Sequence, residues 1–314
     1  MHPALSVILF TTLSGAGYGV LILVGAGAGL APDAVPRGAA AATTLALGLA
    51  AVGLLASFWH LGHPERAWRA FSQWRSSWLS REAVASALAF LPALWMGALL
   101  WRGGDPAALR VAGLATVLGA IATLYCTGWI YRSLKTIPAW HNDYVVPGYL
   151  LLSLATGALW LWFVAVLAGS IAPPETLALT TLLVAAAALH KAFYWRALPG
   201  MAFPSTRESA LGIAGIGTAR AFESPHTEES YLTREMGFRL ARKHASRLRG
   251  LAGGLVAVVL LSLVLAWRWP VAQSAWAALA LLASSAAIFV ERWLFFAEAR
   301  HVVMLYYDRA SAGA

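Results

Sequence analysis

Two ionisable side chains, His60 and Glu82, flank a polar stretch that separates two long apolar segments. Gly62 and Pro64 end the first segment, because the residue before a proline is forced out of the α region. His60 is thereby left at the edge of that segment, and Glu82 opens the next. Histidine has an ordinary pKa of about 6.5, and desolvation moves a carboxyl group toward the same range. Such a pair suits proton exchange with a quinone that gains or loses two electrons.

The same residues also admit a purely structural interpretation. His60 and His63 are then polar residues at a membrane interface, and Glu82 is a favourable negative charge in the first turn of a helix that Ser80 caps. Spacing alone favours this interpretation over a quinone site. Other features of the chain must decide between the two.

The elements that position His60 and Glu82 are long apolar segments. A helix needs about 20 mainly apolar residues to cross the hydrocarbon of a bilayer, and short breaks rich in Pro and Gly separate most of these segments. The sequence predicts an all-α integral membrane protein, a bundle of about eight transmembrane helices. The expected spans are residues 4–29, 38–60, 82–101, 108–131, 145–170, 175–197, 250–269 and 273–295.

Three longer polar connections, at 61–81, 132–144 and 198–249, join these spans. With an even number of spans, both termini and all three connections share one side of the membrane. That side holds most of the 23 lysines and arginines. Cytoplasmic loops are enriched in Lys and Arg, so we expect both termini and the long loops to be cytoplasmic, in a bacterial inner membrane. The opposite side holds Arg37, Arg102, Arg110 and Arg268.

The composition excludes several other classes of protein. Charged residues make up 12% of the 314-residue chain and apolar residues 60%, whereas soluble domains carry about 25% charge. Cys126 is the only cysteine, which excludes a four-cysteine iron–sulfur site and a Cys-based zinc finger. We expect no metal site and no nucleic-acid partner. We also expect no cleavable signal peptide, because residues 3–30 form one long apolar stretch.

Two of the connections have patterns of their own. In 61–81, tryptophan and phenylalanine recur every three to four residues with arginines between them, which predicts an amphipathic segment lying in the membrane interface. The connection 198–249 is longer than a simple link needs, so we expect a cytoplasmic loop for partner docking. Its basic stretch 233–249 is also typical of a helix bound to anionic lipid headgroups. The glycines of 212–217 follow no predicted strand and do not indicate nucleotide binding.

Few other polar residues lie within the expected spans. His190 and His301 fall toward the cytoplasmic side of the expected spans. Histidines that ligate a b-type haem lie nearer the middle of the membrane, so a b-type haem is possible here but not favoured. Glu291 and Arg292, adjacent near the end of the last span, are predicted to anchor it at the membrane rim. A transporter would show broken helices in two symmetric halves, and the sequence shows no such repeat.

Two runs and one longer segment carry a family resemblance. The runs are His60-Leu61-Gly62-His63-Pro64-Glu65-Arg66-Ala67, followed later by Glu82, and Arg292-Trp293-Leu294-Phe295-Phe296-Ala297. With them the chain resembles the membrane-anchor subunits of DMSO reductase-type molybdoenzymes, over nearly all of its length. The segment 226–238 looks most like the anchor of the cytoplasm-facing sulfite dehydrogenase.

The resemblance implies an eight-helix anchor without a catalytic metal of its own. Such an anchor holds a molybdopterin catalytic subunit and a four-cluster ferredoxin-like iron–sulfur subunit at the membrane, and it exchanges electrons with ubiquinone or menaquinone. In a sulfite dehydrogenase the electrons run from sulfite to quinone. A quinol-oxidising anchor of a DMSO or polysulfide-type reductase, or a purely structural anchor without a quinone site, are the alternatives.

The resemblance also implies which residues form the quinone site. In the family, the residues that match His60, Gly62, Arg66 and Glu82 are associated with quinol binding. His60 and Glu82 would form hydrogen bonds and exchange protons, Gly62 would permit close backbone approach, and Arg66 would orient the carboxylate or the quinone. His63 departs from the family, which often has a small polar residue there, and adds a second titratable group to the expected site.

Overall fold

The computed structural model describes residues 3–35, 38–219 and 240–307, together with Phe222, Glu228 and Met236; for His60 and residues 240–243 it describes the backbone alone. These described residues form no strand, and eight of their helices are long and apolar enough to cross a membrane. The predicted all-α membrane fold is therefore confirmed. The eight helices are α1 (Leu5–Leu30), α2 (Ala39–Ala56), α3 (Trp78–Arg102), α4 (Pro106–Arg132), α5 (Val145–Leu167), α6 (Pro174–Ala197), α9 (Leu240–Arg268) and α10 (Gln273–Ala297).

Short helical elements occupy the connections among the described residues. They are η1 (Pro32–Ala34), η2 (Ser57–His60), η3 (Pro64–Phe71), η4 (Leu198–Gly200), α7 (Arg207–Ala210), η5 (Pro270–Ala272) and η6 (Val302–Tyr306).

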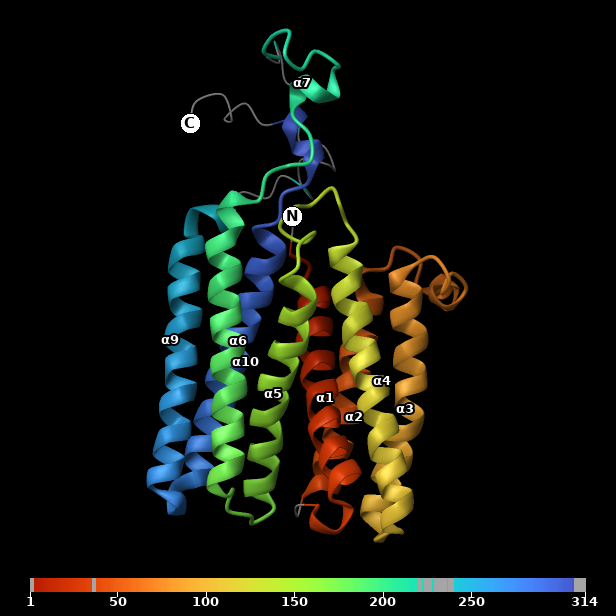
Figure 1. Ribbon diagram of the computed structural model, residues 1–314, viewed down its shortest axis with the longest axis vertical. Coiled ribbons are helices and arrows are strands. Elements are labelled where there is room, and N and C mark those ends of the chain that lie inside the picture. The colour runs from red at the N-terminus through yellow and green to blue at the C-terminus, as the bar shows by residue number, and fades with distance from the viewer. Residues whose placement is uncertain are drawn as a thin grey trace.

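The eight long helices lie side by side with roughly parallel axes (Figure 1). The start of α1, the end of α10 and the longer connections 57–77, 133–144 and 198–219 lie at the same end of the bundle, which we call the loop end. Short turns join the helices at the other end. There Gly103 and Gly169 adopt the left-handed conformation just after α3 and α5, a conformation that glycine reaches without steric cost.

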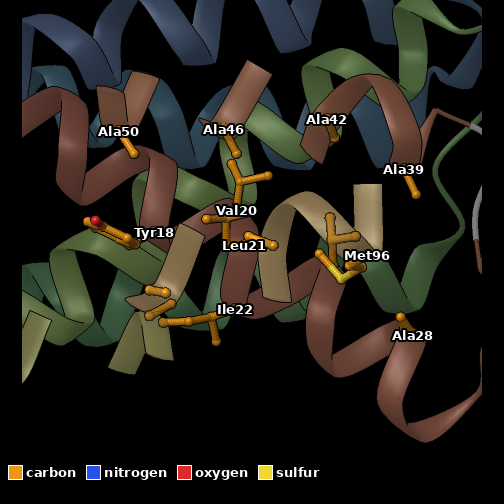
Figure 2. Packing of buried hydrophobic residues seen from close by; sticks show 14 of the residues in the cluster. Tyr18, Val20, Leu21, Ile22, Ala28, Ala39, Ala42, Ala46, Ala50 and Met96 are labelled. Atoms are coloured by element: carbon orange, nitrogen blue, oxygen red, sulfur yellow. The ribbon is translucent and has the colours of Figure 1, made fainter. Parts of the chain in front are cut away.

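The first half of the bundle packs around α1, which contacts α2, α4 and α5. Lipid gives helices little hydrophobic drive to associate, so small residues at their interfaces allow close approach instead. A Cβ atom on Gly157 of α5 would lie 2.4 Å from the carbonyl carbon of Gly19 on α1. Figure 2 shows the same principle at the α1–α2 contact, where small side chains of α2 lie near larger ones of α1. The small residues are Ala39, Ala42, Ala46 and Ala50.

The second half consists of α6, α9 and α10 packed with α5, around the fully buried Trp162 and Leu263. At the loop end a cluster of aromatic side chains joins the halves, and Tyr131 of α4 stacks on Tyr149 of α5 with ring centroids 5.6 Å apart. The indole nitrogen of Trp140 donates a hydrogen bond to the Phe295 carbonyl at 3.0 Å. The connection 133–144 is therefore fixed against α10.

Two helix boundaries differ from the sequence prediction. α3 begins at Trp78, with Ser77 rather than Ser80 at its N-cap position, so Ser80 lies inside the helix and is buried. Glu82 consequently belongs to the second turn of α3 and lies deeper than expected. α9 begins at Leu240 rather than 250, because the basic segment before the apolar stretch continues the same helix.

Candidate functional site

Glu82 is a buried carboxyl group at the interface of α3 and α4. It is 5% exposed, and the hydroxyl of Thr127 on α4 lies within hydrogen-bond distance of its Oε1 atom. The same hydroxyl lies 3.0 Å from the Thr123 carbonyl oxygen. A threonine hydroxyl has one proton to donate, so both contacts become full hydrogen bonds when Glu82 carries a proton and donates it to Thr127. The geometry thus suits a carboxyl group that holds a proton.

Two further hydroxyl groups are buried near Glu82. Ser86 lies one helical turn farther along α3, and Tyr18 of α1 lies within electrostatic reach of the Glu82 carboxyl. The Tyr18 hydroxyl lies near the hydroxyl groups of Ser86 and Thr123, but neither the Tyr18 nor the Ser86 oxygen has a hydrogen bond of good geometry among the described residues. Buried polar groups normally have a partner. Glu82, Thr127, Ser86 and Tyr18 thus form a buried polar group within an apolar part of the bundle.

Three aromatic rings join α3 and α4 within about one helical turn of Glu82 and Thr127 along the chain. Trp78 of α3 and Trp129 of α4 stack with ring centroids 5.0 Å apart, and Tyr125 lies 6.1 Å from Trp78. A guanidinium group lies over each indole, Arg81 at 4.2 Å from Trp78 and Arg132 at 4.4 Å from Trp129. We call this group the aromatic cover. Its two guanidinium groups place positive charge at the loop end of α3 and α4.

Arg81 also fixes the connection that precedes α3. Its guanidinium donates hydrogen bonds to the carbonyl oxygens of Trp74, at 3.0 Å, and Arg75, at 2.7 Å. Trp68, Phe71 and Trp74 of this connection are exposed, which is the arrangement that an interfacial segment requires. The helical part of the segment is η3, and the Trp78 ring belongs instead to α3.

The structure does not gather all the predicted site residues around Glu82. His63 is 66% exposed and lies 3.0 Å from Glu65, and Arg66 is 55% exposed and lies 3.7 Å from the same carboxylate. A Cβ atom on Gly62 would meet no described atom within 4 Å, so no packing among the described residues requires glycine there. The side chain of His60 lies outside the described residues, and its pairing with Glu82 stays a prediction.

A second buried cluster joins α6 and α10, and it corrects the interpretation of Glu291 and Arg292 as rim anchors. Lys191 Nζ lies 2.5 Å from Glu291 Oε1, and Arg292 Nε donates to Glu291 Oε2 at 2.5 Å. The three side chains are between 4% and 9% exposed. A charge is costly in a low-dielectric interior unless it is paired, so these residues form a packed ion-pair network. Arg249 and Glu298 form a second pair beside it, at 2.6 Å.

The two histidines considered for haem both hold backbone groups. The Nε2 atom of His190 lies 2.8 Å from the Tyr144 carbonyl oxygen and donates to it. His301 accepts a hydrogen bond from the Val303 amide on Nδ1 at 3.1 Å, and burial lowers the pKa of its imidazole. Each of these contacts occupies one ring nitrogen.

Sequence reasoning missed Thr127, Ser86 and Tyr18 as partners of the Glu82 site. Each is a single hydroxyl residue in an apolar helix, and such residues more often bond to their own helix backbone, as Thr116 does to Ala112. Lys191 was missed because it stands near the end of an apolar segment and resembled the first cation of a loop. Its partner lies 100 residues farther along the chain.

Comparison with known proteins places the chain among membrane anchors. The sequence profile of the DMSO reductase anchor subunit (DmsC) family matches residues 1–297. A sulfite dehydrogenase subunit of Allochromatium vinosum is 32% identical over 98% of this chain and 99% of its own length.

Two further relatives match over shorter regions. One is the anaerobic dimethyl sulfoxide reductase protein YnfH of Escherichia coli, 32% identical over 48% of this chain and 53% of its own length. The other belongs to the anaerobic dimethyl sulfoxide reductase of Haemophilus influenzae and is 35% identical over 31% of this chain and 34% of its own length. The eight-helix fold, the family profile along nearly the whole sequence and the full-length relative lead to one conclusion. The chain belongs to the DMSO reductase anchor subunit family.

Proposed function

We propose that this chain is the quinone-reactive membrane anchor of a molybdopterin and iron–sulfur oxidoreductase, and that it passes electrons from sulfite oxidation to the quinone pool. The buried Glu82 with its three neighbouring hydroxyl groups is the observation that carries the proposal. The full-length similarity to a sulfite dehydrogenase subunit supports the substrate. The basic loop end would face the cytoplasm of a bacterial inner membrane and hold a four-cluster ferredoxin-like subunit, which in turn contacts the molybdopterin subunit.

Quinone supplies a head that takes up two electrons and two protons. Thr127 fixes the orientation of the Glu82 carboxyl, and Ser86 and Tyr18 offer hydroxyl groups to the oxygens of the head. Glu82 holds one proton close to them. Trp78 and Trp129 limit the access of water from the loop end. The proton of Glu82 therefore passes to the quinone head rather than to bulk water. His60 stands at the end of η2, and it is proposed as the second proton-exchanging group.

The experiment compares three variants of the purified complex: His60→Ala, Glu82→Gln and Glu175→Gln. Glu175 is an exposed carboxylate in the first turn of α6 at the opposite end of the bundle, and it serves as the matched control for Glu82. Sulfite-dependent reduction of a soluble quinone is measured beside sulfite-dependent reduction of ferricyanide, which draws electrons from the partner subunits.

General acid–base catalysis contributes a factor of about 10²–10⁴. We therefore expect His60→Ala and Glu82→Gln to lose about a hundredfold or more of the quinone rate while the ferricyanide rate and the assembly of the complex stay unchanged. Full quinone turnover in both variants would refute the site and indicate a purely structural anchor. A complex that oxidises quinol with dimethyl sulfoxide, and does not oxidise sulfite, would refute the proposed substrate without refuting the site.

A further inference from the structure

The second half of the bundle encloses a cavity of about 260 Å³ between α5, α6, α9 and α10. Most of its wall consists of alanine, leucine and valine side chains. Ala192 of α6 and Gly253 of α9 line the cavity and are also exposed on the outside of the bundle. The cavity therefore reaches the surface between α6 and α9, along helices that cross the membrane, where the surroundings are acyl chains.

One part of the wall is charged. Lys191 and Glu291 line the cavity, and Lys191 lies six residues before the end of α6, about 9 Å below it at 1.5 Å per residue. This charged part lies toward the loop end, and the alkyl-lined part extends from it into the membrane.

The charged cluster holds an excess of positive charge. Lys191 and Arg292 are two cations around the single carboxylate of Glu291, and the neighbouring Arg249–Glu298 pair is neutral in itself. Removing a charge from water costs several kcal/mol in a protein interior unless an opposite charge compensates it. One more negative charge beside Lys191 would balance the cluster.

The cavity wall also carries hydrogen-bond donors. Lys191 has three N–H groups, and its ammonium nitrogen lies 2.5 Å from Glu291 Oε1 and 3.9 Å from the centre of the Tyr194 ring. Trp195 lines the cavity, and its buried indole N–H has no hydrogen-bond partner among the described residues. A ligand that brought acceptor oxygens would satisfy these donors.

We propose that this cavity binds the anionic head of a single-chain or two-chain amphiphile, a carboxylate or a phosphodiester. The head oxygens would contact Lys191 and Trp195, and an alkyl chain would lie along the apolar wall and leave between α6 and α9. This site is separate from the Glu82 site, which is built by α1, α3 and α4. It does not depend on the proposed quinone reaction.

Photolabelling tests the proposal on the full-length protein in phosphatidylcholine vesicles. Three probes carry the same photoreactive acyl chain: a free fatty acid, a phosphatidylglycerol and a phosphatidylcholine. We expect labelled peptides from α6 and α9 with the fatty acid, the phosphatidylglycerol or both, and the probe that labels identifies the source of the head. Equal labelling by the zwitterionic phosphatidylcholine, or no labelling of these helices by any probe, would overturn the proposal.

Two pairs of variants locate the site. Gly253 and Gly254 are neighbours on the exposed side of α9, and a Cβ atom on either would meet no described atom within 4 Å, but only Gly253 lines the cavity. Gly253→Leu should therefore reduce labelling, and Gly254→Leu should not. Lys191→Met should reduce labelling and Lys191→Arg should retain it.

The expected reduction is about tenfold or more, as when one charged partner of a buried contact is removed. Should Lys191→Met not fold, the glycine pair decides alone, because it leaves the ion-pair network intact. Labelling of Gly253→Leu equal to that of Gly254→Leu would refute the site.

Discussion

In the ion-pair network of α6 and α10, loss of the negative charge should destabilise the protein more than loss of one positive charge. Glu291→Gln would leave Lys191 and Arg292 as two buried cations without an anion. Removing one partner of a buried ion pair destabilises a protein by about 3–5 kcal/mol. Lys191→Met instead leaves Glu291 paired with Arg292 at 2.5 Å and removes the excess positive charge.

The stabilising interaction that Lys191→Met removes is mainly the contact of the Lys191 ammonium with the ring of Tyr194, which contributes about 0.5–2 kcal/mol. The two variants should therefore differ by about 2–4 kcal/mol. A change of 1 kcal/mol shifts the Tm of a protein of this order of size by about 2–4 °C. We expect Glu291→Gln to unfold about 5–15 °C below Lys191→Met.

Thermal unfolding of the delipidated protein in one mild detergent measures this difference, because delipidation removes any bound amphiphile from the comparison. The double variant Lys191→Met/Glu291→Gln should be more stable than Glu291→Gln alone, since it buries one unpaired cation instead of two. Were Lys191→Met as destabilising as Glu291→Gln, Lys191 rather than Arg292 would be the main partner of the carboxylate, and the charge accounting behind the cavity site would fail with it.

Two further predictions concern packing and pH. Gly157→Ala should destabilise the protein by about 1–3 kcal/mol, because the added Cβ atom would lie 2.4 Å from the carbonyl carbon of Gly19 and force α1 and α5 apart. Gly254→Ala has open space around its Cβ atom and should leave the stability unchanged. The same thermal unfolding assay compares the two variants. Burial lowers the pKa of His301, so the folded state binds fewer protons than the unfolded state and the stability of η6 falls as the pH drops below about 6.5. The protection of the amides of residues 302–306, measured as exchange relative to the intrinsic rate at each pH, should fall in that range, and His301→Asn, which keeps an acceptor for the Val303 amide without titrating there, should remove the effect.

The sequence was sufficient for the membrane fold because hydropathy and length report directly on a bilayer. The eight spans are present, and the Pro and Gly breaks fall between them as expected. α3 begins at Trp78, four residues before the predicted start at 82, because Trp78 and Leu79 are apolar enough to join the helix. Arg81 also belongs to the helix, and its guanidinium lies over the Trp78 ring. A cation that lies over an aromatic ring has its charge partly compensated, and no hydropathy scale records that.

The partners of the buried carboxyl groups were out of reach for a different reason. Glu82 bonds to Thr127 on the next helix, and Glu291 pairs with Lys191 from a helix much earlier in the sequence. Which faces of two apolar helices meet depends on the packing of small residues such as Gly19 and Gly157. Apolar residues occupy nearly all faces of each helix, so their spacing does not show which face is buried. The sequence could therefore mark Glu82 as a candidate but could not supply its surroundings.

The two buried carboxyl groups are built for opposite purposes. Glu291 lies between two cations that hold it as a carboxylate, so it compensates charge and is poorly suited to carry a proton. Glu82 has a hydroxyl partner instead, and the cations of the aromatic cover, Arg81 and Arg132, lie over indole rings. A carboxyl with hydroxyl partners can take up and release a proton without breaking an ion pair. This contrast, rather than burial, is the reason to assign proton exchange to the α3–α4 interface and ligand anchoring to the α6–α10 interface.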